Sequence, residues 1–91
     1  MSREIDERIA TEVMMGPWSS DDPDAFLKLL GKFPRYTLRF LRSKKFKAAP
    51  FRTTIYAMND GSILGDAYGV TALESLKTAA LRAVGGEGGR K

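Results

Sequence analysis

The spacing of apolar residues changes twice along this 91-residue chain, and those changes restrict its fold class. Up to residue 33 apolar residues recur every three or four positions, which is typical of helices with one apolar stripe. Over 35–68 apolar and polar residues alternate, or β-branched and aromatic residues gather, which indicates strands. The helical spacing returns over 71–84. The sequence therefore predicts an α+β domain with the element order α-α-β-β-β-α.

Start and stop signals set the limits of the first two expected helices. The first covers 4–15 and ends at Gly16, which we expect to take the left-handed conformation that closes a helix. The second covers 23–32, with Asp22 as its N-cap and a proline at its first position.

The last helix is expected over 71–84, where Thr71 and Glu74 form a capping box. Its alanines are small enough for close packing on a sheet. Residues 1–84 then make one globular domain, and 85–91 form a glycine-rich tail that we expect to be disordered.

Three strands are expected over 35–40, 51–58 and 62–68, joined as an antiparallel meander by a basic connection and the 59–61 turn, Asn-Asp-Gly. In the first strand the side chains alternate, with Tyr36, Leu38 and Phe40 on one face and Arg35, Thr37 and Arg39 on the other. We expect one face of this sheet to take the helices. In the second strand Ile55 and Tyr56 both qualify as the buried residue.

The chain contains no cysteine and no histidine. This excludes disulfides, thiol nucleophiles, Cys/His zinc sites and imidazole acid–base catalysis. We expect no enzyme, no catalytic residue, no cofactor and no metal, and we interpret Asp21, Asp22 and Asp24 as residues that cap the second helix. No apolar run approaches the length of a membrane span, so we expect a soluble protein of the bacterial cytoplasm without a membrane partner.

Charge is distributed unevenly along the chain. Residues 1–24 carry seven acids and two bases, whereas 25–59 carry nine bases and no acid. A segment of this kind attracts nucleic acid, an acidic protein face or anionic lipid. The alternative is that its bases fold back against the acidic first helix.

The candidate partner-binding residues lie in this basic segment. Arginines on a strand face keep a fixed spacing and can bind carboxylates or phosphates with two hydrogen bonds, and an aromatic ring among bases can stack or fill a pocket. The candidates are Arg35, Arg39, Arg42, Lys44, Lys45, Phe46, Lys47 and Arg52. Outside this segment, Trp18 is expected in the core, and Met14 and Met15 cannot both face the same core.

Three segments resemble the phage ABA sandwich domain, a family of small phage and prophage proteins. They are IDERIATEVMMG (5–16), PWSSD (17–21) and VTALESLKTAALRAVG (70–85). The resemblance implies a layered α/β fold and a phage context, and it supplies no catalytic residue. The middle of the chain is more basic than that family implies.

The order α-β-β-β-α over 23–84 also resembles the double-stranded RNA-binding domain. The stretch from Lys44 to the 59–61 turn lies where that family has its first loop and second strand. That family opens its last helix with phosphate-binding lysines. Here the corresponding stretch carries Glu74, with only Lys77 behind it.

Three functions follow as expectations. The first is a non-enzymatic binding module of phage or prophage origin that docks on an acidic host or phage protein, with inhibition of a bacterial defence system, as in anti-CRISPR proteins, as a subclass. The second is a nucleic-acid-binding domain that uses the same bases. The third is a structural homodimer that pairs its sheet edges or its Met14 and Met15 surfaces.

Overall fold

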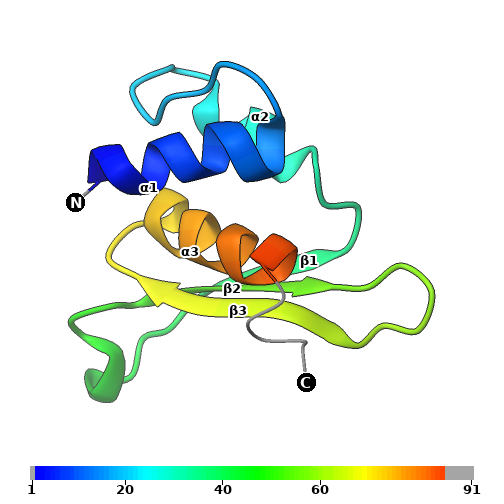
Figure 1. Ribbon diagram of the computed structural model, residues 1–91. Coiled ribbons are helices and arrows are strands. Elements are labelled where there is room, and N and C mark those ends of the chain that lie inside the picture. Colours follow the sequence, from blue (N-terminus) through cyan, green and yellow to red (C-terminus); the bar gives the residue numbers. More distant parts are fainter. Residues whose placement is uncertain (1, 86–91) are drawn as a thin grey trace.

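A computed structural model describes residues 2–85 and confirms the α+β class and the expected element order (Figure 1). The elements are α1 (Ser2–Ile9), η1 (Ala10–Met14), α2 (Ala25–Leu30), β1 (Tyr36–Phe40), η2 (Lys44–Phe46), β2 (Phe51–Tyr56), β3 (Ile63–Gly69) and α3 (Ala72–Gly85). Gly85 belongs to the last helix, so the helix continues one residue into the predicted tail. The rest of that tail, 86–91, lies outside the described residues. No helix within 2–85 is long and apolar enough to cross a membrane.

The three strands form an antiparallel meander in the order β1-β2-β3. One row across the sheet, Leu38, Thr53 and Ala67, belongs to the face that carries α3, because Thr53 bonds to Ser75 of that helix. The next row, Arg39, Arg52 and Tyr68, belongs to the opposite face, which we call the open face. The alternation predicted for the first strand is therefore confirmed.

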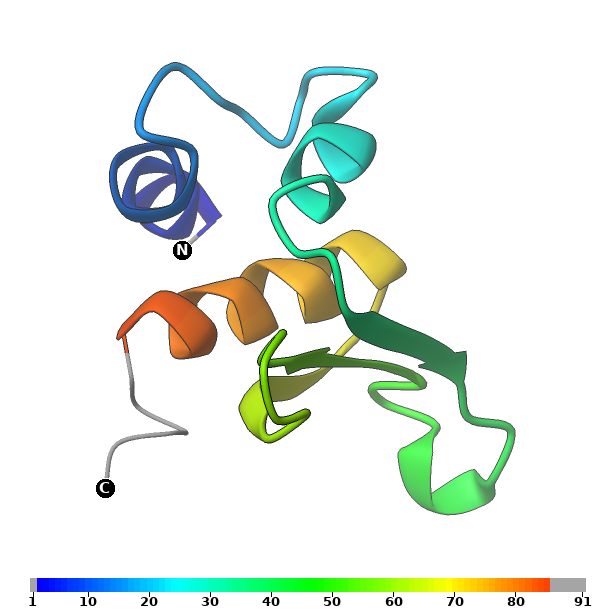
Figure 2. The same ribbon diagram turned by 90° about the vertical axis from the view of Figure 1, so that its right-hand side faces the viewer.

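The helices form two layers rather than one (Figure 2). Helix α3 lies directly on β2 and β3, and α1 and α2 pack on the side of α3 that faces away from the sheet. Because α3 is covered from both sides, Leu76, Ala79 and Ala80 are fully buried. The other partners of this core include Ile9, Leu29 and Ile55, which settles the buried position of β2 in favour of Ile55 over Tyr56.

Helix α3 approaches β3 so closely that two strand positions have no room for a side chain. A Cβ atom at Gly65 would lie 2.2 Å from the carbonyl oxygen of Ala79, and one at Gly69 would lie 2.4 Å from the backbone nitrogen of Ser75. Next to this contact the hydroxyls of Ser75 and Thr53 share a hydrogen bond of 2.7 Å between helix and sheet. The small residues expected on the last helix thus meet glycines on the strand.

We expect Gly65→Ala to destabilise the protein by about 3 kcal/mol, because the added methyl group meets helix backbone that cannot move aside without shifting α3. Chemical denaturation measures the free energy of unfolding. Gly16→Ala is the control: a Cβ there meets nothing within 4 Å, so its effect should stay within about 0.5 kcal/mol. Equal stability of the two variants would contradict the close helix–strand contact.

The end of the first helix differs from the prediction. The helix widens into the π-helical turn η1, and Met15 rather than Gly16 takes the left-handed conformation, with φ of 56°. The N–H groups of Met15 and Gly16 both donate to the carbonyl of Ala10, and this wider closure moves the left-handed position one residue earlier. Met15 is 84% exposed while Met14 packs against the core, as their adjacency required.

The start of α2 also differs, because the helix begins at Ala25 instead of residue 23. The Asp22 side chain accepts a hydrogen bond from the Asp24 N–H at 2.9 Å, which forms a turn ahead of the helix in place of an N-cap. Trp18 is buried as expected, and its indole N–H donates to the carbonyl of Ala25 at 3.2 Å. The loop before α2 is thereby fixed to the core.

Met15→Gly should stabilise the protein by about 1 kcal/mol, because glycine takes the left-handed conformation without the steric cost that methionine bears. Little apolar contact is lost, since Met15 is exposed. Thermal unfolding should show a rise of several degrees in Tm. Met14→Gly, the control, should lower the stability by about 2 kcal/mol because Met14 is helical and packs on the core. A lower Tm for Met15→Gly would contradict this account.

Candidate binding surface

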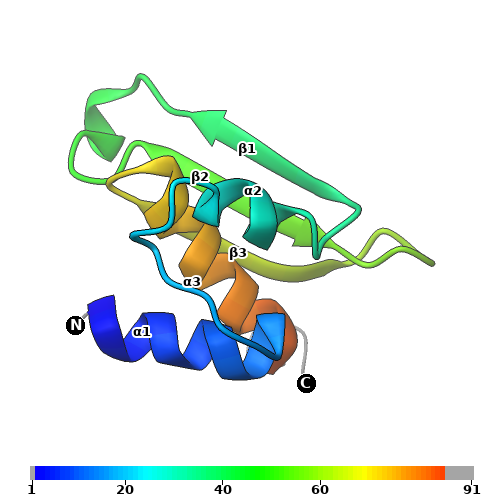
Figure 3. The ribbon, with the colours of Figure 1, turned by 90° about the horizontal axis from the view of Figure 1, so that it is seen from above.

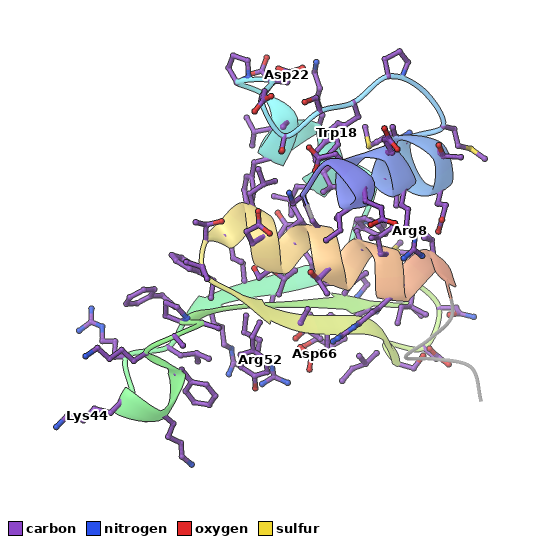
Figure 4. All side chains as sticks on the ribbon, turned by 60° about the vertical axis from the view of Figure 1, so that its left-hand side comes forward. Arg8, Trp18, Asp22, Lys44, Arg52 and Asp66 are labelled. Atoms are coloured by element: carbon purple, nitrogen blue, oxygen red, sulfur yellow. The ribbon has the colours of Figure 1, made fainter. Side chains whose placement is uncertain are left out.

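The open face of the sheet has a hydrogen-bonded centre built from neighbouring strands. The Arg52 guanidinium on β2 donates two hydrogen bonds, of 2.9 and 2.8 Å, to the carboxylate of Asp66 on β3. The Thr54 hydroxyl donates a third, of 3.0 Å, to the same carboxylate. Figure 4 shows Arg52 and Asp66 on the side of the sheet away from α3.

This centre fixes the charge of both partners. Hydrogen bonds from the Arg52 guanidinium, above all, hold the pKa of Asp66 below its usual range, and they outweigh the opposite effect of burial. The same hydrogen bonds raise the pKa of Arg52. Of the predicted binding residues, Arg52 is thus already occupied by a carboxylate of its own sheet.

Phe46 also has a partner within the chain. Its ring stacks on the ring of Tyr68, with 5.4 Å between centroids and 5° between planes. Arg52 also contacts this pair, with its guanidinium carbon 5.4 Å from the centroid of the Tyr68 ring. The loop between β1 and β2 is therefore held against the open face, and Phe46 anchors it.

The remaining candidates divide between the two ends of the sheet. Arg35 lies at the β2–β3 turn, where its guanidinium donates to the carbonyl of Met58 at 3.3 Å. The others are exposed and gather around the β1–β2 loop at the opposite end; we call this group the basic end, and it comprises Arg39, Arg42, Lys44, Lys45 and Lys47. Within the described part of the chain no carboxylate forms an ion pair with any of these five.

A groove of about 750 Å³ lies within the basic end. Its apolar part comes from Phe40, Leu41 and Pro50, and its basic part comes from Arg42, Lys44 and Lys47 together with the backbone around Ser43. The Phe40 ring meets that of Phe51 edge to face at 5.1 Å, which fixes one wall. This combination suits a ligand that carries both an apolar group and a negative charge.

The acids of the first 24 residues lie on the far side of the molecule from the basic end. In Figures 1 and 4, α1 and Asp22 lie above α3, whereas η2 and Lys44 lie below the sheet. Asp22 forms an ion pair of 2.7 Å with Lys28, and Glu12 one of 3.1 Å with Arg8. Of the nine bases in 25–59, Lys28 is the one that pairs with a described acid of the first 24 residues, so the fold-back alternative is wrong.

One buried cation was missed in the sequence. Lys77 on α3 is 1% exposed, and its ammonium lies 3.0 Å from Asp6 on α1 and 3.2 Å from Glu74. Asp6 also accepts hydrogen bonds from the backbone N–H and the hydroxyl of Ser20. The position of Lys77, four residues after Leu73 and next to Leu76 on the apolar face of this helix, was the available signal that it faces another element.

This cluster joins three segments that are distant in sequence. Burial raises the pKa of Asp6, but the hydrogen bonds from Ser20 and the nearby Lys77 ammonium together hold it below its usual range. The carboxylate is therefore ionised in the folded protein at neutral pH and offsets the buried ammonium.

Asp6→Ala should destabilise the protein by about 3 kcal/mol, because it removes the main partner of a buried ammonium. Adding Lys77→Met should recover part of that loss, so the two effects should be non-additive by at least about 1 kcal/mol in a double-mutant cycle of unfolding free energies. Strictly additive effects would contradict a direct Asp6–Lys77 interaction.

The same cluster sets an acid limit for stability. Because the pKa of Asp6 is lower in the folded than in the unfolded chain, its contribution is present above about pH 4 and is lost as the pH falls further. Asp6→Ala should therefore lose less stability than the parent between about pH 5 and pH 3. Parallel pH profiles would contradict the assignment.

The comparisons leave the chain without an assigned relative. No protein-family model matches it, and neither the curated proteins nor the solved structures contain a significant match. The two family resemblances noted in the sequence thus stay predictions. Within the described residues no three acids gather as a metal-binding group, Asp21, Asp22 and Asp24 included.

Proposed function

We propose that this protein is a non-enzymatic binding module that docks on an acidic protein surface through its basic end. The observation that carries the proposal is the group of five exposed cations, Arg39, Arg42, Lys44, Lys45 and Lys47, that pair with no described carboxylate. Like charges in one place repel one another, and a partner with negative charge removes that repulsion.

The rigidity of this region supports docking. The Phe46–Tyr68 stack holds the loop against the open face, so the backbone that carries its cations is ordered before binding. The groove beside Phe40 adds an apolar contact next to Arg42, Lys44 and Lys47. An apolar anchor surrounded by charges is a common arrangement in protein–protein interfaces.

A phage or prophage origin rests on the ABA sandwich resemblance of residues 5–21 and 70–85. Inhibition of a bacterial defence system, by covering a site that the host uses, is a prediction from the size of the chain and that context. On this proposal the partner is an acidic host protein.

Nucleic acid is the second candidate, favoured by one observation. The acids of α1, which would repel a polyanion, lie on the far side of the molecule from the basic end. One observation disfavours the double-stranded RNA-binding mode in particular: Lys77, the first base of the last helix, is buried against Asp6 and does not face a phosphate. The stack of Phe46 on Tyr68 leaves fewer ring faces for the bases of a single strand.

Arg39→Glu combined with Lys45→Glu should abolish partner binding and leave the fold intact, because both side chains are exposed. The measurement is capture of proteins from a bacterial lysate by the immobilised protein, with and without nuclease. Lys32→Glu with Arg35→Glu is the matched control, since it changes the net charge equally at exposed residues away from the basic end and breaks no described ion pair.

Nuclease-resistant capture that the first pair abolishes and the second pair keeps supports the proposal. Equal capture by both variants contradicts the placement of the binding surface. Capture that nuclease removes, together with a gel shift that weakens steeply between about 50 and 200 mM salt, favours the nucleic-acid function instead.

A further inference from the structure

The two edges of the sheet differ in how their backbone is covered. At the β3 edge the guanidinium of Arg82 donates a hydrogen bond of 2.7 Å to the carbonyl of Asp66. At the β1 edge no described residue makes such a contact with the strand backbone. Figure 3 shows β1 at the margin of the sheet, outside the cover of α3.

The register identifies which backbone groups of β1 are available. The carbonyl of Arg35 accepts from the Tyr56 N–H and the Leu41 N–H donates to Pro50, so odd-numbered residues turn their backbone groups toward β2. In an antiparallel strand successive residues alternate in this respect. The N–H and C=O groups of Tyr36, Leu38 and Phe40 therefore point away from the sheet.

The same three residues present their side chains to solvent. Tyr36, Leu38 and Phe40 are 41, 37 and 58% exposed, although they belong to the face of the sheet that carries α3. We call them the apolar ledge. An edge strand with free backbone groups and an exposed apolar row is a template for a further strand.

We propose that β1 accepts an extended, acidic segment of a partner protein as a fourth, antiparallel strand. In such a strand the residues opposite Tyr36, Leu38 and Phe40 would be apolar and would cover the apolar ledge. The alternate residues would fall on the open-face side, beside Arg39, where a carboxylate would find a cation that has no described partner.

Charge selects this occupant over a second copy of the chain. The apolar ledge continues at Phe40 into the groove that Arg42, Lys44 and Lys47 line. Antiparallel pairing of two β1 strands would place the basic end of each copy beside Arg35 of the other, so that cations would face cations. An acidic segment removes that repulsion, and its end would lie in the groove.

This inference rests on the proposed function and deepens it, since it states how the acidic partner is held. The probe is a labelled nine-residue peptide with alternating glutamate and valine, added to the full chain in fluorescence anisotropy at low salt. A peptide of the same composition in scrambled order, and one that alternates lysine and valine, should each bind at least tenfold more weakly.

Backbone methylation tests the hydrogen bonds themselves. In an antiparallel fourth strand the valine N–H groups face β1 and the glutamate N–H groups face away. N-methylation of the central valine should weaken binding at least tenfold, whereas N-methylation of a neighbouring glutamate should leave it nearly unchanged. Equal binding of the two methylated peptides, or tighter binding of the valine-methylated one, overturns the proposal.

Variants of the chain test the same contact from the other side. Leu38→Pro removes an N–H that points away from β2, so it should keep the fold while weakening the peptide at least tenfold. Leu38→Lys, which places a charge in the apolar ledge without altering the backbone, should do the same. Met58→Lys, an exposed substitution at the far turn, is the control and should not weaken binding.

Hydrogen exchange locates the site. Peptide binding should slow exchange of the amides of Tyr36, Leu38 and Phe40, which face outward, and leave those of Thr37 and Arg39 unchanged. Absence of peptide binding, or protection elsewhere, overturns the strand addition.

If lysate capture still depends on Arg39 and Lys45 in that case, the proposed function stands without the strand addition. A peptide-independent rise in mass by light scattering that Leu38→Lys removes would assign the edge to a second copy instead.

Discussion

The contact between α3 and β3 sets the geometry of the whole molecule. Glycines at 65 and 69 let the helix backbone approach the strand closely enough that no side chain fits between them. A helix that packs this closely on β3 covers β3 and β2 but does not extend over β1. The exposed ledge on β1 is thus a result of where α3 lies, since the same apolar row would be buried under a helix placed over the middle of the sheet.

The low position of α3 also creates its second interface. One side of α3 contacts the sheet, and the other side packs against α1 and α2. Lys77 is buried on this second side and needs a negative partner from the helices that cover it. Asp6 supplies this charge and connects α1 to the loop that Trp18 fixes. Asp6, Glu12 and Asp22 therefore pair with cations of the helices, and none of them pairs with the cations of the β1–β2 loop on the opposite side.

Local signals predicted most of the fold. The change of period predicted the elements, and Gly61 takes the positive φ expected in the turn. The Thr71 hydroxyl accepts from the Glu74 N–H at 3.1 Å, which is one half of the predicted capping box, whereas the Glu74 carboxylate pairs with Lys77. What depended on distant contacts was missed. The burial of Lys77 requires Asp6, which lies 71 residues away, and the left-handed Met15 follows from a widened turn that no local residue announces.

The candidate site was predicted in composition but not in shape. The sequence showed that 25–59 lacks acids, and six of the eight candidate residues, Phe46 included, do gather around one loop. Arg35 and Arg42 lie at opposite ends of β1. An extended strand advances about 3.3 Å per residue, so the seven positions between them correspond to the length of the sheet. Arg52 and Phe46 found partners on β3, and that pairing depends on a register that sequence alone did not fix.

The separation of acids above α3 from bases below the sheet has a consequence for the encounter with any anionic partner. Two opposite poles give the molecule a permanent electric moment along the axis that joins them, beyond its formal net charge of +4. In the potential of a negative surface such a body experiences a torque that turns its positive pole forward before contact. Collisions would then be pre-oriented at distances up to the Debye length, about 8 Å at physiological salt.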